Sequence, residues 1–189
     1  MFDTYLEKIS HKWIILNDLN LKHNKSFQID SVLIGGQSIY PIDVKNFEHD
    51  YYMENGQWYH PNYPNDGKDL LLQLQRSKSL FQQLLTNLGY SNFTFISRLV
   101  FVNPTFTLYE APRDLPAILP TQMNGFIENL GKQAVHVDFS HRKLADKLIS
   151  MHRTKSEYSI IPAYDFESLE KGIFREKCRR EWNWKEENL

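Results

Sequence analysis

The chain has 189 residues, of which 41% are hydrophobic and 14% aromatic, enough for one packed domain with a modest appendage. Its 22 Lys+Arg and 23 Asp+Glu residues give a formal charge of -1, which excludes a disordered tail and a strongly basic coat protein. The lone Cys178 excludes a disulfide framework and a cysteine-based zinc site within one chain. No apolar run approaches the ~20 residues that span a bilayer, and residues 1–7 lack a signal-peptide pattern, so we expect a cytoplasmic protein without membrane contact.

The first quarter of the chain is predicted to form strands around tight turns. A short amphipathic opening over 2–9 precedes three apolar runs that read as strands, over 13–16, 27–34 and 38–45. Asn17-Asp18 and residues 23–26 are predicted turns. Gly35-Gly36-Gln37 separates the last two strands, where glycine supplies the positive φ that a tight hairpin needs.

The rest of the chain predicts one more hairpin and then mostly helices. The hairpin spans 50–60 with Asn55-Gly56 as its turn, and 61–67 reads as a loop. Leucines at 3–4-residue steps predict a helix over 69–88, followed by strands over 93–102 and 105–109. Three further helices are expected, at roughly 122–130, 141–152 and 166–182. This order indicates an α/β domain with a helical C-terminal extension.

The hairpin over 27–45 carries the clearest chemical signal. If its loop is Gly36-Gln37, Asp30 lies opposite Asp43 and Gln28 opposite Lys45; if the loop is Gly35-Gly36, Asp30 lies diagonal to Asp43. In either register these polar residues share one face of the sheet. Two carboxylates held together are an oxygen site for Mg²⁺ or Mn²⁺, and a lysine beside them can assist an attacking water. The plainer alternative is a structural pair between Asp30 and Lys45, with Asp43 solvated.

These blocks resemble a known family. The run F-Q-I-D-S-V-L-I over 27–34, the run I-Y-P-I-D-V-K-N-F over 39–47 and the helix opening L-L-L-Q-L-Q-R over 70–76 are similar to the nuclease-related domain. That domain is a branch of the restriction-endonuclease-like, PD-(D/E)XK, superfamily. The resemblance implies a core of helix, three strands, helix and strand, that is, a mixed β-sheet flanked by helices. We therefore expect a nuclease-related domain over 1–112 and the helical extension over 113–189.

The resemblance also implies a function and a set of site residues. It implies hydrolysis of DNA phosphodiester bonds with Mg (or Mn) as the cofactor. Asp30 and Asp43 would be metal ligands, the Val44 carbonyl a third ligand, and Lys45 the lysine that contacts water or phosphate. Gln73, on the following helix, would point towards the site or the substrate.

One departure from the family pattern leaves alternatives open. Relatives carry a Gly-Glu pair in a helix before a segment like Phe2-Asp3-Thr4, and the sequence begins at Met1 without it. Either the native chain extends upstream, or the site holds metal with fewer groups. A module that keeps the nuclease fold and binds nucleic acid or a protein partner without cutting is therefore the second hypothesis. The C-terminal helices, which carry basic runs over 142–155 and 171–180, are the expected surface for a protein partner, a second copy or phosphates; solvated helix faces are the plainer reading of those runs.

Overall fold

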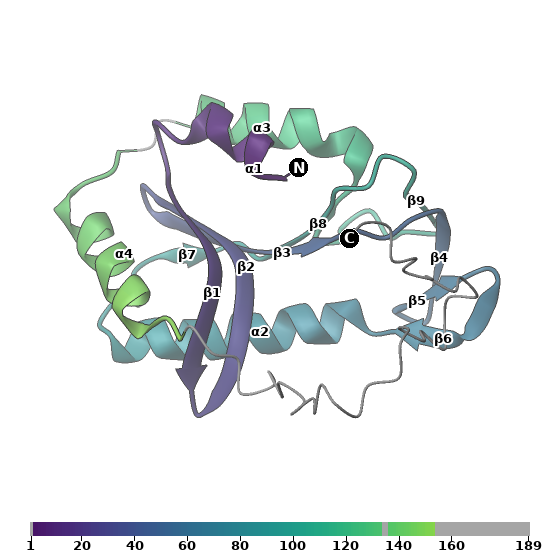
Figure 1. Ribbon diagram of the computed structural model, residues 1–189, viewed down its shortest axis with the longest axis horizontal. Coiled ribbons are helices and arrows are strands. Elements are labelled where there is room, and N and C mark those ends of the chain that lie inside the picture. The colour runs from purple at the N-terminus through teal and green to yellow at the C-terminus, as the bar shows by residue number, and fades with distance from the viewer. Residues whose placement is uncertain (1, 134–135, 154–189) are drawn as a thin grey trace, which may run out of the picture. The chain divides into compact units, whose positions relative to one another are not determined.

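An antiparallel meander forms one half of the main sheet in the computed structural model (Figure 1), which describes residues 2–133 and 136–153. Its strands are β1 (Ile14–His23), β2 (Lys25–Gly35) and β3 (Ser38–Lys45). Between β1 and β2 the turn centres on Asn24, whose φ of 56° is tolerated by asparagine. A two-residue loop, Gly36-Gln37, joins β2 to β3, and Gly36 takes the positive φ, 56°, expected of it.

Parallel strands complete the sheet on the other side of β3. The short β7 (Thr94–Phe95) and the longer β8 (Arg98–Phe101) both pair with β3, and β10 (Ala117–Ile118) pairs with β8. The prediction of one continuous strand over 93–102 is therefore wrong, since residues 96 and 97 interrupt it. The reason lies in β3. The Ile96 N–H donates to the Ile39 carbonyl, and the next hydrogen bond of a parallel ladder would come from the N–H of residue 41. Residue 41 is Pro41, which has no N–H to donate.

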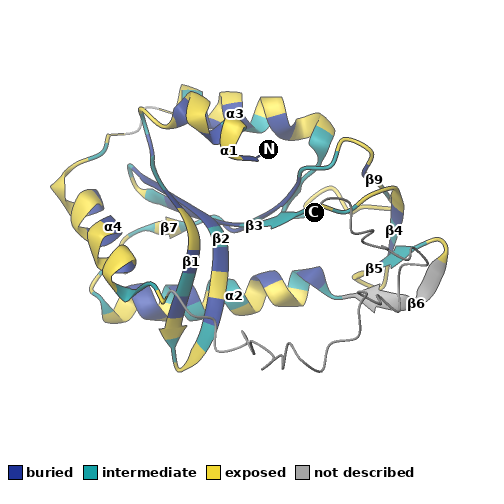
Figure 2. Ribbon diagram, viewed as in Figure 1, coloured by how far each residue is buried: buried dark blue, intermediate teal, exposed yellow. Residues whose placement is uncertain are grey.

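Helices cover both faces of this sheet (Figure 1). On one face lie α1 (Phe2–Leu6), the 3₁₀ turn η1 (Glu7–Ile9) and α3 (Met123–Lys132), which a second 3₁₀ turn, η2 (Pro120–Gln122), precedes. Their apolar side chains form one core cluster with residues of β3 and β8, including Ile42 and Val100. On the other face, α2 (Leu70–Asn87) and α4 (Phe139–Met151) enclose a second cluster against β1 and β2. Figure 2 shows that both α2 and α4 carry buried as well as exposed positions.

Helix α2 begins and ends where its local sequence dictates. The Asp69 carboxylate accepts the Leu72 N–H at 2.9 Å as an N-cap, and Gly89 follows with a φ of 85°. Phe81 and Leu85 are fully buried beneath the sheet. This helix confirms the prediction over 69–88, and α3 and α4 agree with the helices predicted at 122–130 and 141–152. The helix predicted at 166–182, and the basic run at 171–180, lie outside the described residues.

A second, smaller sheet packs near the start of α2. Within the described residues it has four strands in the order β6-β5-β4-β9, namely β6 (Tyr63–Lys68), β5 (Gln57–His60), β4 (Asp50–Glu54) and β9 (Thr107–Tyr109). The Asn55-Gly56 turn is confirmed, with φ values of 50° and 79°. The loop predicted over 61–67 is wrong because most of that segment forms β6. Pro64 and Gly67 favoured a loop, but an edge strand tolerates proline since one side of it needs no ladder hydrogen bonds.

The turn predicted at Asn17-Asp18 is also wrong, for an instructive reason. Asp18 does adopt a positive φ of 53°, yet β1 continues through it, pairing Asn17 with Ser31 and Leu19 with Ile29. The buried Leu16, Leu19 and Leu21 hold the flanking backbone in the sheet. The local preference therefore produces an irregularity inside a strand instead of a chain reversal.

The described residues after position 112 pack onto the same unit as the residues before it. β10 extends the main sheet, the Lys12 ammonium donates to the Gly131 carbonyl at the end of α3, and Trp13 Nε1 donates to the Leu130 carbonyl at 3.3 Å. The division at residue 112 stays a prediction. None of the helices in 2–133 and 136–153 is both long and apolar enough to cross a membrane.

Candidate nuclease site

The hairpin register brings Asp30 and Asp43 opposite each other. The pairs from Gly35↔Ser38 to Ser31↔Ile42 match the register in which Gly36-Gln37 forms the loop and rule out the other one. Asp30 and Asp43 come directly after the last pair, where β2 begins to diverge from β3. Gln28 and Lys45 are therefore not paired, and the Gln28 amide instead donates to Asp18 Oδ1 at 2.8 Å.

The Asp30 carboxylate takes the place of the missing strand partner. Its Oδ2 accepts the Val44 N–H at 2.7 Å, a bond that the β2 backbone would otherwise receive. Because a residue in a strand directs its N–H and C=O to the same edge, the Val44 carbonyl also faces the gap between β2 and β3. Two carboxylates and one main-chain carbonyl thus converge on this gap.

Lys45 pairs with Asp43. Its Nζ lies 2.8 Å from Asp43 Oδ1, with the two side chains 21% and 25% exposed. These residues stand two apart on β3 and so project from the same face of the sheet. The alternative prediction, in which Asp30 pairs with Lys45 and Asp43 stands alone in solvent, differs from the arrangement found.

Burial raises the pKa of Asp30 above its ordinary value, and the charge and hydrogen-bonding proximity of Asp43 raise it further. The hydrogen bond from the Val44 N–H and the positive charge of Lys45 oppose this rise. A carboxylate whose surroundings disfavour its negative charge gains most from a cation nearby. A cation bound beside the pair would oppose the rise in the pKa of Asp30.

Helix α2 forms the opposite wall of an open cleft at this pair. The cleft has a volume of about 570 Å³, and its lining includes Asp30, Asp43, Val44, Lys45 and Gln73. The structure thus places every residue singled out from the sequence at one opening. We call it the acid-pair cleft. Gln73 reaches it because it lies on the exposed side of α2, whose buried Leu70 and Leu74 fix the helix against the sheet.

Two cations at the acid-pair cleft were missed as site residues. Arg76 lines it one turn after Gln73, and Lys25 lines it from the start of β2. The three-residue spacing from Gln73 was a sequence signal that could have identified Arg76. Nothing local marks Lys25, because its position depends on the course of the β1–β2 hairpin towards α2.

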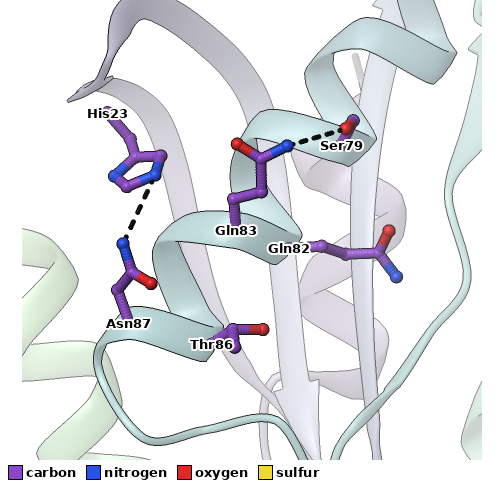
Figure 3. Close-up of a pocket in the computed structure, with 6 residues that line it drawn as sticks. All are labelled: His23, Ser79, Gln82, Gln83, Thr86 and Asn87. Carbon is purple, nitrogen blue, oxygen red and sulfur yellow. Dashed lines mark hydrogen bonds between the residues drawn. The ribbon is translucent and has the colours of Figure 1, made fainter.

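Two other clefts lie close to this one. A cleft of about 460 Å³ shares Asp30 and Val44 with the acid-pair cleft and extends to Asp3 on α1, whose Oδ1 accepts the Asn17 amide at 3.1 Å. A third, of about 440 Å³, lies between the end of β1 and the second half of α2 (Figure 3). Its lining contains no lysine, arginine or carboxylate, and its His23 ring stands 3.5 Å from the Asn87 amide. It lacks the carboxylates that hold a metal.

The donor set at the acid pair suits a hard divalent cation. Mg²⁺ and Mn²⁺ take oxygen ligands, commonly one or two carboxylates with waters and phosphate oxygens completing the shell. Asp30, Asp43 and the Val44 carbonyl fit that description. In the described part of the chain no group of three or more His, Cys, Asp or Glu side chains is placed to hold a metal ion.

Comparison with known proteins agrees with this assignment of the domain. No curated protein and no solved structure matches the chain significantly. A family model described as the nuclease-related domain matches residues 1–102, which is more than half of the sequence and contains Asp30, Asp43, Lys45 and Gln73. The chain therefore belongs to the nuclease-related domain family.

Proposed function

We propose that this protein is a metal-dependent nuclease that hydrolyses phosphodiester bonds of DNA. The observation that carries the proposal is the convergence of Asp30, Asp43 and Lys45 with Gln73 on one open cleft, within a domain of the nuclease-related family. The order of α1, three antiparallel strands, α2 and the parallel strand β8 supports a restriction-endonuclease-like core, with the small sheet inserted between β3 and α2.

The cofactor proposed is Mg²⁺ or Mn²⁺, held by Asp30, Asp43 and the Val44 carbonyl. When bound, such an ion supplies Lewis-acid stabilisation of the phosphate oxygens. Lys45 Nζ, beside Asp43, is placed to orient the attacking water and to neutralise the charge that grows on the phosphate. The water oxygen forms the new bond to phosphorus as the bond to the leaving sugar oxygen breaks. Gln73 can donate its amide to a phosphate oxygen and fix the strand in the cleft.

Plasmid DNA incubated with the full chain in Mg²⁺, in Mn²⁺ and in chelator tests the proposal. Cutting is expected with either ion, absent in chelator and absent in Lys45→Gln. Lys132→Gln is the matched control, because Lys132 is an exposed lysine on α3 outside the lining of the acid-pair cleft. Thermal melting shows whether each variant is folded. Cutting that survives in chelator or in folded Lys45→Gln would refute the mechanism.

One observation favours a second candidate, a nuclease-fold module that binds nucleic acid or a protein partner without cutting. Among the described residues the site offers two clustered carboxylates, whereas a third would strengthen a metal site. This candidate predicts DNA retarded on a gel without metal-dependent turnover. The same plasmid samples, run in chelator as a gel-shift assay, separate the two functions.

A further inference from the structure

The acid-pair cleft is lined by both acidic and basic side chains. Asp30 and Asp43 lie together on neighbouring strands, where Lys45 forms an ion pair with Asp43 at 2.8 Å. The other two cations of the lining, Arg76 and Lys25, are exposed and form no ion pair within the described residues. They come from two different elements, since Arg76 lies on α2 and Lys25 at the tip of the β1–β2 hairpin.

This arrangement does not serve folding. Exposed cations without partners contribute little to stability. Cations set apart from a carboxylate pair in one cleft suit an anion that is itself extended. Its central charge can then meet an ion held by the acids while its neighbouring charges meet the cations.

The spacing suits a nucleic-acid strand. Arg76 lies three residues beyond Gln73, about 4.5 Å along the helix axis. Lys25 lies five residues before Asp30, about 17 Å along β2. Successive phosphates of a stacked strand advance about 3.4 Å each, so a strand of several nucleotides extends over a length comparable to these intervals.

We propose that Arg76 and Lys25 form a phosphate-binding track that holds one nucleic-acid strand in the acid-pair cleft, beside Asp30 and Asp43. This inference rests on the proposed function for the identity of the ligand. Arg76 can grip a phosphate through two N–H donors, whereas Lys25 acts as a point charge. The third cleft, around Gln82 and Gln83 on α2, contains no lysine or arginine and adds no such contact.

The salt dependence of binding tests the track apart from cleavage. The probe is a fluorescent single-stranded oligonucleotide of about 20 nucleotides, long enough to fill a single-strand site. The protein is the full chain carrying Asp30→Asn and Asp43→Asn, in chelator. Those changes remove the two negative charges that a bound metal would otherwise neutralise, and they prevent metal-dependent cutting. The logarithm of the association constant is measured against the logarithm of salt concentration by fluorescence anisotropy.

In that background, Arg76→Gln and Lys25→Gln should each make the slope shallower by about 0.7, and together by about 1.4. Arg76→Lys should retain the slope, because it keeps the charge. Lys78→Gln, on the same helix but outside the cleft lining, should leave it unchanged.

Separate outcomes decide the track and the nuclease. The track is overturned if Arg76→Gln and Lys25→Gln have the same slope as the background, or if Lys78→Gln loses as much slope as they do. It is also overturned if the background protein does not bind the oligonucleotide. Absence of metal-dependent cutting by the wild-type chain overturns the nuclease proposal while the slopes still decide the track. If the wild type cuts, Arg76→Gln should raise KM by several-fold with little change in kcat.

Discussion

Replacing Asp30 with asparagine tests whether Asp30 is a metal ligand or a structural residue. The change keeps an oxygen that can accept the Val44 N–H, now bonded at 2.7 Å, but makes this a neutral bond, at a cost of about 1 kcal/mol. It also removes one of two carboxylates that face each other across neighbouring strands, a gain of about 0.2–1 kcal/mol. The two effects nearly cancel, so the free energy of unfolding without metal should change by less than about 1 kcal/mol.

The response to metal should change much more than the stability of the metal-free protein. A ligand at ten times its Kd stabilises the folded state by about 1.4 kcal/mol, which for a chain of this size raises Tm by about 3–6 °C. We expect this shift with Mg²⁺ in the wild type and its loss in Asp30→Asn. Differential scanning fluorimetry with and without chelator measures both quantities. Asp146→Asn, an exposed carboxylate on α4, is the matched control and should keep the shift.

Two results would refute this reasoning. A Mg²⁺ shift that persists in Asp30→Asn shows that Asp30 is not a ligand. A loss of about 3–5 kcal/mol without metal shows instead that the Asp30 charge is part of a structural ion-pair network.

Three further changes test how the fold holds the site. Leu85→Ala, which empties a fully buried position beneath the sheet, should cost about 2–5 kcal/mol in chemical denaturation. Gly36→Ala should cost about 1 kcal/mol because of the φ of 56°, whereas Gly125→Ala, in the first turn of α3 with open space around it, should gain up to about 1 kcal/mol; equal effects would contradict this. Hydrogen bonds from His141, above all the one from its backbone N–H, lower the pKa of Asp138. The capping interaction made by Asp138 therefore stabilises the fold at pH values above the pKa of this carboxyl in the unfolded chain. The stabilisation is lost as the pH falls through the lower pKa of the folded state. The Tm deficit of Asp138→Ala should therefore be largest near neutral pH and shrink below about pH 4; a deficit independent of pH would contradict this.

Much of the site could be inferred before any tertiary structure was known. Strand alternation is enough to place Asp30, Asp43 and Lys45 on one face, and the glycine loop narrows the register to two choices. Whether Lys45 would pair with Asp30 or with Asp43 was not determined by spacing. That choice depends on the divergence of β2 from β3, which lets the Asp30 carboxylate take the Val44 N–H and leaves Asp43 to the lysine.

The errors in the strands share one cause. The local features behind both turn or loop predictions are present: Asp18 adopts a positive φ, and the segment 61–67 contains proline and glycine. Burial of the neighbouring leucines and an edge position in the small sheet turned both segments into strands. In β7 and β8 the reverse holds, because a strand predicted to be continuous is interrupted opposite Pro41, a residue more than 50 positions earlier.

The sequence by itself determined the helices with strong periodicity, the two glycine turns, the acid pair and the family. These are local properties, set by hydrophobic spacing, turn chemistry and short motifs. Only the tertiary structure decided that Arg76 and Lys25 stand at the same cleft as the acids, because their position depends on how the β1–β2 hairpin and α2 pack on each other. Such long-range packing is governed by the burial of side chains from several elements together, and no single segment of sequence contains that information.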